Sequence, residues 1–391
     1  MRGDQFGTSS GERRARFLKR GGSALCAVLL AEVLLAPALA AAQPAPQPAT
    51  EKSPAGAPLI QIFSTVQGAK PALQPSPDTP VAPQFQESYQ AWLAMKKKAN
   101  GGTHYDRANF AKMPDWSGVW TRTGGFNWNS PPVVERQATG IGPAAAQAML
   151  DHCSSFPCKG WLEADLTPKY AERYLDKLTA VAHGFEWDQL SDCLPSGFPR
   201  FLLNPFYREF TVTPQETWLS QETQGEYRRI YTDGRGHVSD DDSHPLWEGD
   251  SIGFWDGDTL VVHTIRVKAE ELQRNMPSVS ADASVIERIR LVDPNTIEIT
   301  ATLYDPNVLQ KPWTGVHRYV RVDAPVARLD MWSCEENNNV VPTPEGASTF
   351  ILPGEPGYKD PDNIQNMWTE KAIAYGAKLR AEAAAKKASG Q

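Results

Sequence analysis

The sequence predicts a mainly β protein, in which an antiparallel meander is closed as a barrel or folded as a sandwich. Two observations predict it. After Tyr207, short runs rich in β-branched and aromatic residues follow one another, namely REFTVT, TWLSQ, EYRRIYT, DSIGFW, DTLVVHTIRV, SVIERIRLV, TIEITATLY and GVHRYVRV. Pro, Gly, Asp and Asn separate these runs at short, regular spacing, which is typical of consecutive antiparallel strands.

Two reversals in this region have recognisable turn chemistry. Asp256-Gly257 lies between Trp255 and Asp258 and predicts a two-residue hairpin, because such turns favour positive φ. Asp293-Pro294-Asn295 predicts a second, looser reversal. A further short strand is expected upstream, over Asp115–Arg122.

Helices are expected on both sides of the strands. The segment from Phe85 to Ala99 has Tyr89, Trp92 and Met95 at helical spacing, which favours a docking face over a cofactor site. Residues 138–192 form a helical insert, with helices at 142–150 and 168–181, the second capped by Thr167. A last helix is predicted in residues 361–391, so that residues 84–360 form a single barrel-like domain.

The N-terminus has the composition of a signal peptide, predicted over residues 1–42. Arg and Lys residues precede the apolar run Ala24–Leu39, and small residues follow for cleavage. This predicts export to the periplasm or beyond through a Sec signal, and Arg13-Arg14 leaves the twin-arginine route as an alternative. Residues 43–83 are rich in Pro and Ala and predict a linker. No later run is long enough for a transmembrane helix.

The cysteines suit an oxidising compartment. Cys26 lies in the signal, and the four that remain predict two disulfides, Cys153 with Cys158 and Cys193 with Cys334. A metal site beside His152 is the alternative, although the spacing fits no common zinc pattern.

The charge balance argues against nucleic acid as a partner. The chain has 39 basic and 46 acidic residues, a formal charge of −7, whereas phosphate binding requires concentrated Lys and Arg. The 12 Trp favour aromatic-lined surfaces instead.

Alternation along the strands places two unusual side chains among apolar neighbours. His263 shares a face with Val261 and Ile265, so it is either a hydrogen-bonded core histidine or a residue that faces a ligand. Arg318 shares a face with valines and is expected to be buried, which requires a carboxylate or an anionic ligand. Asp305, Asp250 and Asp258 are the expected structural partners.

The loop from His237 to His244 places three adjacent Asp between two His. It could bind a divalent cation, supply a general base, or be a solvated acidic turn. The spacing lacks the alternate-position pattern of a calcium loop, and no metal is predicted.

Aromatic residues near the same strands suggest a small-molecule site. Trp247, Trp255 and Trp313 could line the mouth of a barrel, together with Arg318 and Tyr319. The chain contains no G-x-S-x-G elbow, Walker loop, Rossmann glycine pattern or H-E-x-x-H helix, which excludes the commonest enzyme classes.

Several motifs together resemble a large, mostly uncharacterised family of exported bacterial proteins. They are Trp116–Trp120 (WSGVW), Leu166–Tyr170 (LTPKY), Cys193–Arg200 (CLPSGFPR), Arg229–His237 (RIYTDGRGH) and Trp247–Val262 (WEGDSIGFWDGDTLVV). The resemblance implies export but no settled activity. This chain differs in a longer loop around Asp240–His244, and in His263 where relatives tend to have Asp. Gly118-x-Trp120 before a meander also resembles lipocalin-like barrels, and this bears on the fold class alone.

Three functions fit these observations. The first is binding of a small hydrophobic or aromatic molecule in the barrel. The second is a lyase, isomerase or hydrolase on the same scaffold that uses His/Asp acid–base chemistry, and the third is an envelope interaction module. The candidate catalytic residues are His237, His244, Asp250, Asp258, His263 and His317. The sequence identifies no cofactor, ligand or oligomeric state.

Overall fold

The computed structural model describes residues 76–124, 128, 142–185, 189–268, 272–322, 327–330, 340–342, 348–350 and 364–389. The predicted signal peptide and most of the predicted linker lie outside the described residues. Among the described helices, none has both the length and the apolar character that a membrane-crossing helix requires.

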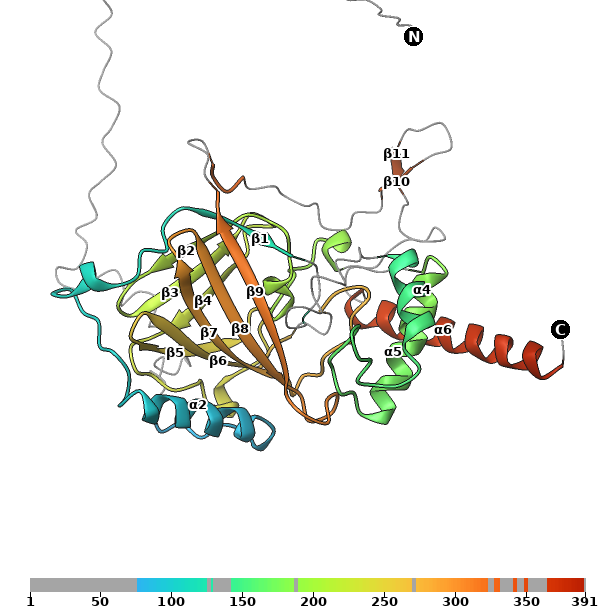
Figure 1. Ribbon diagram of the computed structural model, residues 1–391, viewed down its shortest axis with the longest axis horizontal. Helices are drawn as coiled ribbons and strands as arrows, with labels where there is room; N and C mark the ends of the chain where they lie inside the picture. The colour runs from blue at the N-terminus through green and yellow to red at the C-terminus, as the bar shows by residue number, and fades with distance from the viewer. Residues whose placement is uncertain are drawn as a thin grey trace, which may run out of the picture. The chain divides into compact units, whose positions relative to one another are not determined.

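Nine strands close into one barrel in chain order, so the predicted barrel is confirmed and the sandwich is not adopted (Figure 1). Its strands are β1 (Val119–Thr123), β2 (Arg208–Val212), β3 (Glu216–Gln221), β4 (Tyr227–Tyr231), β5 (Asp250–Asp256), β6 (Thr259–Ile265), β7 (Ser284–Asp293), β8 (Thr296–Tyr304) and β9 (Trp313–Arg321). Pairing of β1 with β9, which places Arg122 opposite Tyr319, completes the closure. A separate pair, β10 (Val340–Pro342) and β11 (Ser348–Phe350), is also antiparallel.

The meander is not antiparallel throughout, which corrects the prediction. The strands β4 and β5 are parallel, and they pair only at Tyr231 and Ile252. The chain between them, residues 232–249, contacts the outer face of β6 through His237 and His263 before β5 begins. The residues of β4 before Tyr231 and those of β5 before Ile252 are not paired with each other. We call this gap between the two strands the seam.

Both predicted reversals form. Asp256-Gly257 joins β5 to β6 with Gly257 at φ +63°, the conformation that its missing Cβ permits. Asp293 to Thr296 joins β7 to β8.

Helix α2 (Gln86–Lys98) covers the outer face of β5, β6 and β7 (Figure 1). Its Trp92 is 2% exposed and packs on Ile252, Phe254, Val261 and Ile286, with Tyr89 beside them. The Trp92 indole also donates to the Val261 carbonyl at 3.4 Å. The predicted docking face is therefore present, and it makes the outer face of these strands as buried as the inner one.

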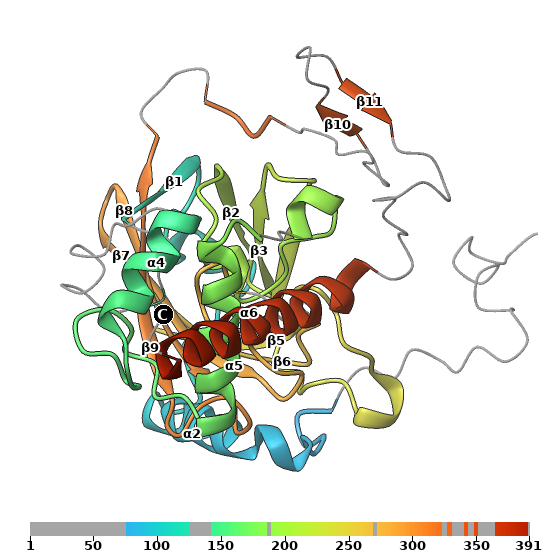
Figure 2. The same cartoon turned by 90° about the vertical axis from the view of Figure 1, so that its right-hand side faces the viewer.

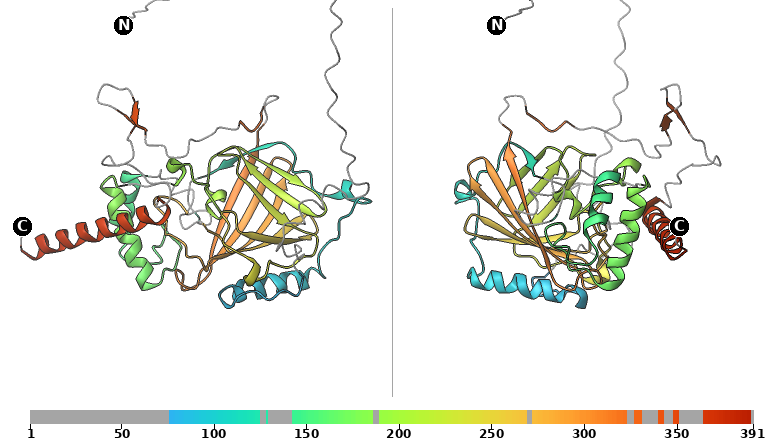
Figure 3. Two further views of the ribbon diagram at one scale, coloured as in Figure 1. Left: turned by 180° about the vertical axis from the view of Figure 1, so that it is seen from behind. Right: turned by 45° about the vertical axis from the view of Figure 1, so that its right-hand side comes forward.

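The predicted helical insert forms helices α4 (Pro143–His152) and α5 (Pro168–Ala182). The C-terminal helix α6 (Ile364–Ala388) packs against α5, with Arg173 bound to Glu370 and Arg380 to Asp176, each at 2.5 Å. Figure 2 shows these three helices together on one side of the barrel, and Figure 3 shows α2 on a different face.

The barrel interior contains the main hydrophobic core. Its inward-facing residues include Trp120, Phe210, Leu219, Leu260, Val262, Ile299 and Trp313. Polar side chains interrupt this core near the seam and along β9, and these interruptions position the candidate site.

Candidate functional site

A pocket of about 320 Å³ opens where β4 and β5 separate. The outward-facing side chains of β4 form one wall, and the loop before β5 forms the other. The lining residues are Tyr227, Arg229, Tyr231, Val238, Ser243, His244, Leu246, Glu248, Gly249, Asp250, Ser251 and Arg266. We call this the seam pocket, and its volume is within the range of small-molecule sites.

The chain enters β5 through a tight approach at Gly249. The residue has φ +68°, and a Cβ there would lie 2.7 Å from the Thr264 methyl group and 2.9 Å from the Ile265 carbonyl oxygen. Only glycine fits both the dihedral angle and the space. Glu248 and Asp250 therefore flank a backbone position in the pocket wall whose conformation is constrained.

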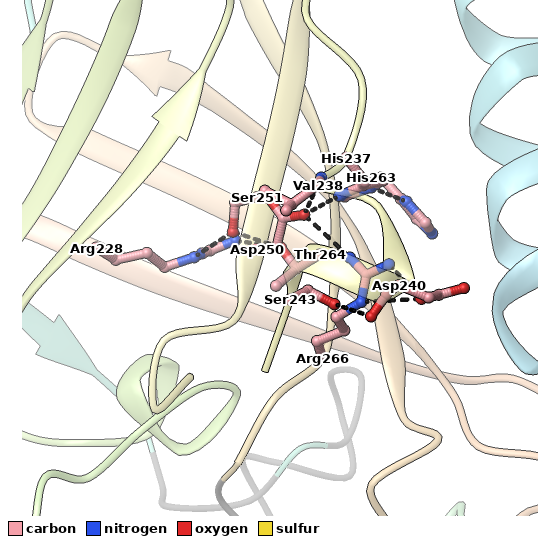
Figure 4. Close-up of polar contacts among 10 residues, drawn as sticks. All are labelled: Arg228, His237, Val238, Asp240, Ser243, Asp250, Ser251, His263, Thr264 and Arg266. Carbon is pink, nitrogen blue, oxygen red and sulfur yellow. Dashed lines mark hydrogen bonds and ion pairs between the residues drawn. The ribbon is translucent and has the colours of Figure 1, made fainter. Parts of the chain in front are cut away.

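Asp250 is the outer end of a hydrogen-bonded chain that continues beneath α2 (Figure 4). The Asp250 carboxylate lies 3.0 Å from Nδ1 of His237. Nε2 of His237 lies 2.8 Å from Nδ1 of His263, whose Nε2 lies 2.9 Å from the Ser88 hydroxyl. Ser88 in turn lies 2.7 Å from the Ser284 hydroxyl.

The two histidines form the buried middle of this chain. Burial first, and the neighbouring His237 second, hold the pKa of His263 well below its usual range, so its ring is neutral. The Asp250 carboxylate accepts from Nδ1 of His237, and His263 joins His237 to the Ser88 hydroxyl through its two ring nitrogens. The Ser88 hydroxyl also donates to the Phe85 carbonyl at 3.0 Å. Both His are fully buried, so the chain is a buried network that links α2 to the barrel wall and ends in the pocket.

Arg266 fixes the loop over the pocket. Its guanidinium lies 2.5 Å from Asp240 and 3.3 Å from Asp250, whose carboxylate also accepts from the Val238 amide at 3.0 Å. The acidic loop is therefore held by an arginine, with Asp240–Asp242 in one 3₁₀ turn. No group of three or more His, Cys, Asp or Glu in the described part of the chain is arranged to hold a metal ion.

Behind the pocket, a buried ion pair connects the wall to the barrel interior. The Arg228 guanidinium binds both oxygens of Glu287, at 3.0 and 2.5 Å, and the two side chains are fully buried. It also donates to Ser251 at 3.2 Å and Thr264 at 2.6 Å, and lies 3.8 Å from the Phe198 ring centroid. The charges of Arg228 and Glu287 neutralise each other, so we assign this ion pair a structural role.

Glu248 differs from these residues because its carboxylate is buried without a partner. Neither oxygen has a hydrogen bond among the residues that the structure describes. Burial raises the pKa of Glu248 well above its usual range, and the nearby Glu226 raises it further. The group is therefore neutral over a wider pH range than an exposed glutamate, and it can both donate and accept a hydrogen bond.

The structure brings together some of the predicted site residues. His237, His244, Asp250 and His263 lie at or just behind the seam pocket. His263 lies on the outer face of β6 under α2, as a hydrogen-bonded histidine with both ring nitrogens bonded. His317 and Tyr319 lie inside the barrel, and Asp258 is exposed at the β5–β6 turn.

Two predictions about the binding residues are wrong. Arg318 is exposed on the outside of β9 and pairs with Glu298 at 2.9 Å, not with Asp305, Asp250 or Asp258. The three tryptophans do not line one mouth: Trp255 packs on Tyr105 and Trp116, Trp313 lies near Trp128, and Trp247 lies under Lys268. The alternation of side chains along a strand separates them into two faces, but it does not show which face points into the barrel.

Sequence reasoning missed Glu248, Arg266, Arg228 and Ser88. A signal existed for the buried pair, because Glu287 shares a strand face with Val285 and Ile289, which places a charge among core residues. Ser88 and Arg266 carried no such signal, since their partners are distant in sequence.

One predicted disulfide is confirmed between Cys153 and Cys158. Cys193 is also disulfide-bonded, and its predicted partner Cys334 lies outside the described residues. The alternative metal site at His152 loses Cys153 as a ligand, and the His152 ring stacks on Trp161 at 4.1 Å.

Comparison with known proteins gives no family. No family model matches the chain, and no curated protein matches it. Among solved structures, the chain is similar to a luciferase domain from the dinoflagellate Lingulodinium polyedrum, with 10% identity over 73% of this chain and 78% of that one. The TM-score is 0.20, so this likeness carries no argument about function.

Proposed function

We propose that the protein is an exported binding protein that holds a small, mainly aromatic or hydrophobic molecule in the seam pocket. The observation that carries the proposal is Glu248, a residue of the pocket wall whose buried carboxyl has no hydrogen-bond partner among the described residues. A buried polar group without a partner costs about 1–3 kcal/mol, and a ligand with one polar group would remove that cost.

The other lining residues fit such a ligand. Tyr227 is 55% exposed and Leu246 45%, an unusual exposure for large apolar side chains, and both line the pocket. Tyrosine rings provide rigid surface for an aromatic molecule at little cost in conformational entropy. The expected ligand therefore has an apolar body between Tyr227 and Leu246 and a polar group at Glu248.

Acid–base catalysis in the same pocket is the second candidate, and one observation favours it. Asp250 and Glu248 flank Gly249 in the pocket wall, and Asp250 ends the chain through His237 and His263, whereas Glu248 is held in its neutral form. Two carboxyl groups in such different environments could serve as base and acid. In that case Glu248→Gln would abolish turnover of the bound molecule while its binding remained.

Native mass spectrometry of the protein purified from its own cells tests the proposed binding. We expect a retained small molecule in the wild type and its loss in Tyr227→Ala. Tyr207→Ala is the matched control, because Tyr207 is a tyrosine of 38% exposure outside the pocket. A wild-type protein without any bound molecule, or equal retention by both variants, would contradict the proposal.

Export is a separate part of the proposal and rests on the predicted signal over residues 1–42. N-terminal sequencing of the protein from fractionated cells tests it. A mature chain that starts near residue 43 in the periplasmic or secreted fraction is expected, and an intact N-terminus in the cytoplasm would oppose it.

A further inference from the structure

The barrel interior has a second polar region along β9, β1 and β2, which adjoins the seam pocket at Glu248, whose carboxyl interacts electrostatically with Arg208. Alternation turns His317 and Tyr319 inward with Trp313, and Arg122 lies opposite Tyr319 in the register. Arg208 on β2 is paired with Trp120 on β1, and both side chains are buried. Two guanidiniums and an imidazole therefore face one another inside the barrel.

These groups lack partners that their chemistry requires. His317 is 1% exposed, and neither of its ring nitrogens has a hydrogen bond among the residues described by the structure. The Nε atoms of Arg122 and Arg208 are also buried without partners in this set. Arg208 is 0% exposed, and its other nitrogens donate to the Phe201 and Asn204 carbonyls, at 3.1 and 2.8 Å, which carry no charge.

No described carboxylate forms an ion pair with either arginine. Glu287 is bound by Arg228. Glu226 is bound by Ser196 and Gln221, and burial raises its pKa and that of Glu248, which weakens both as counter-ions for Arg208. Burial lowers the pKa of Arg122 to about 10, with Tyr319 acting against this change and Arg208 adding to it, so Arg122 is still charged at neutral pH. Arg208 is fully buried and Arg122 is half-buried, with one of its nitrogens donating to the Gly124 carbonyl at 3.5 Å. Two charges of the same sign at such sites are unfavourable without a strong counter-ion.

We propose that this interior region binds a small carboxylate, held by the guanidiniums of Arg122 and Arg208 and by a ring N–H of His317. Arginine matches the planar geometry of a carboxylate with paired donors. Aromatic rings surround the three groups, with Trp128 4.9 Å from the His317 ring and Tyr319 4.4 Å from the Arg208 guanidinium. These walls favour an organic acid over a fully hydrated phosphate.

Thermal unfolding at pH 7 and constant ionic strength tests this site, with sodium acetate, benzoate or phosphate replacing sodium chloride. We expect a saturable rise in Tm with at least one of the carboxylates. Arg122→Gln should weaken that effect at least tenfold in midpoint concentration. Arg318→Gln is the matched control, because Arg318 follows His317 on the same strand but is exposed on the opposite face.

Three results would overturn the proposal: no shift with either carboxylate, equal shifts in the two variants, or stabilisation by phosphate alone. If Arg122→Gln does not fold, NMR of the wild type with labelled benzoate or acetate replaces the variant. Contacts between the labelled carboxylate and the ring protons of His317, Trp128 or Tyr319 are expected, and a bound probe without such contacts refutes the site. Tyr227→Ala should leave carboxylate binding unchanged, which separates this site from the seam pocket.

Discussion

At the scale of single residues, Glu248 and Asp250 have carboxyl groups in different hydrogen-bonding environments. They lie two residues apart in the wall of one pocket. Asp250 accepts hydrogen bonds from the Val238 amide and the Arg266 guanidinium, whereas the carboxylate of Glu248 is buried without a partner in the described structure. The fixed turn at Gly249 between them produces this difference.

The pH dependence of stability should report the state of Glu248. Its pKa is raised in the folded protein, so its contribution to stability is present below the unfolded value of 4.5 and is lost as pH rises through the folded value. Each unit by which the pKa is raised corresponds to about 1.4 kcal/mol. Glu248→Gln, which does not ionise, should therefore become more stable relative to wild type as pH increases from 4 to 7.5.

Urea unfolding of both proteins across this pH range measures the difference. Glu226 and Asp305 also have raised pKa values, but both proteins retain them, so their contribution cancels. A difference in the free energy of unfolding that stays constant with pH would show that Glu248 is ionised in the folded state at neutral pH.

The inner face of β9 could not be identified from the sequence. In β9, alternation separates His317 and Tyr319 from Val316, Arg318 and Val320, and the valines suggest that their face is the inner one. The inner face instead contains the polar His317 and Tyr319, because Arg122 and Arg208 from other strands meet them there. Such a choice depends on contacts between distant segments, which a single strand pattern does not contain.

At the scale of elements, α2 is joined to the barrel by both apolar and polar contacts. Trp92 fills the apolar contact on β6 and β7, and Ser88 ends the hydrogen-bonded chain through His263. The spacing of Tyr89, Trp92 and Met95 predicted the docking face. The polar contact could not be predicted, because Ser88 and His263 are 175 residues apart.

Removal of the Trp92 side chain should release α2 from the barrel. A buried Trp→Ala substitution costs about 3–5 kcal/mol, so Trp92→Ala is expected to destabilise the protein by that amount. Lys97→Ala on the exposed face of the same helix should change stability by less than about 0.5 kcal/mol. Hydrogen exchange in α2 should increase in Trp92→Ala more than exchange in β8. Equal increases in both elements would mean that α2 is not an independent unit.

At the scale of the whole molecule, the barrel has two short strand junctions, β1–β2 with two residue pairs and the seam with one. The pairs β7–β8 and β8–β9 are matched over nearly their whole length, whereas β4 and β5 meet at one residue pair. The regular runs and the Asp256-Gly257 turn predicted the strands and their order. The parallel pairing could not be predicted, because it depends on the path of residues 232–249 between the two strands.

Amide exchange should identify the seam as a weak part of the barrel in comparison with β8. The backbone amides that face the seam, before Tyr231 in β4 and before Ile252 in β5, have no hydrogen-bond partner on the other strand. We therefore expect them to exchange well before those of β8. Hydrogen exchange with mass spectrometry or NMR measures this order. Protection across the seam equal to that of β8 would show that the two strands close in solution and that the pocket is not open.

A crystal structure of the protein with its natural ligand retained would test whether the seam pocket is the binding site. We expect ligand density between Tyr227 and Leu246, with a polar atom of the ligand within hydrogen-bond distance of the Glu248 carboxyl. A ligand found at another place, with only ordered water in the seam pocket, would contradict it.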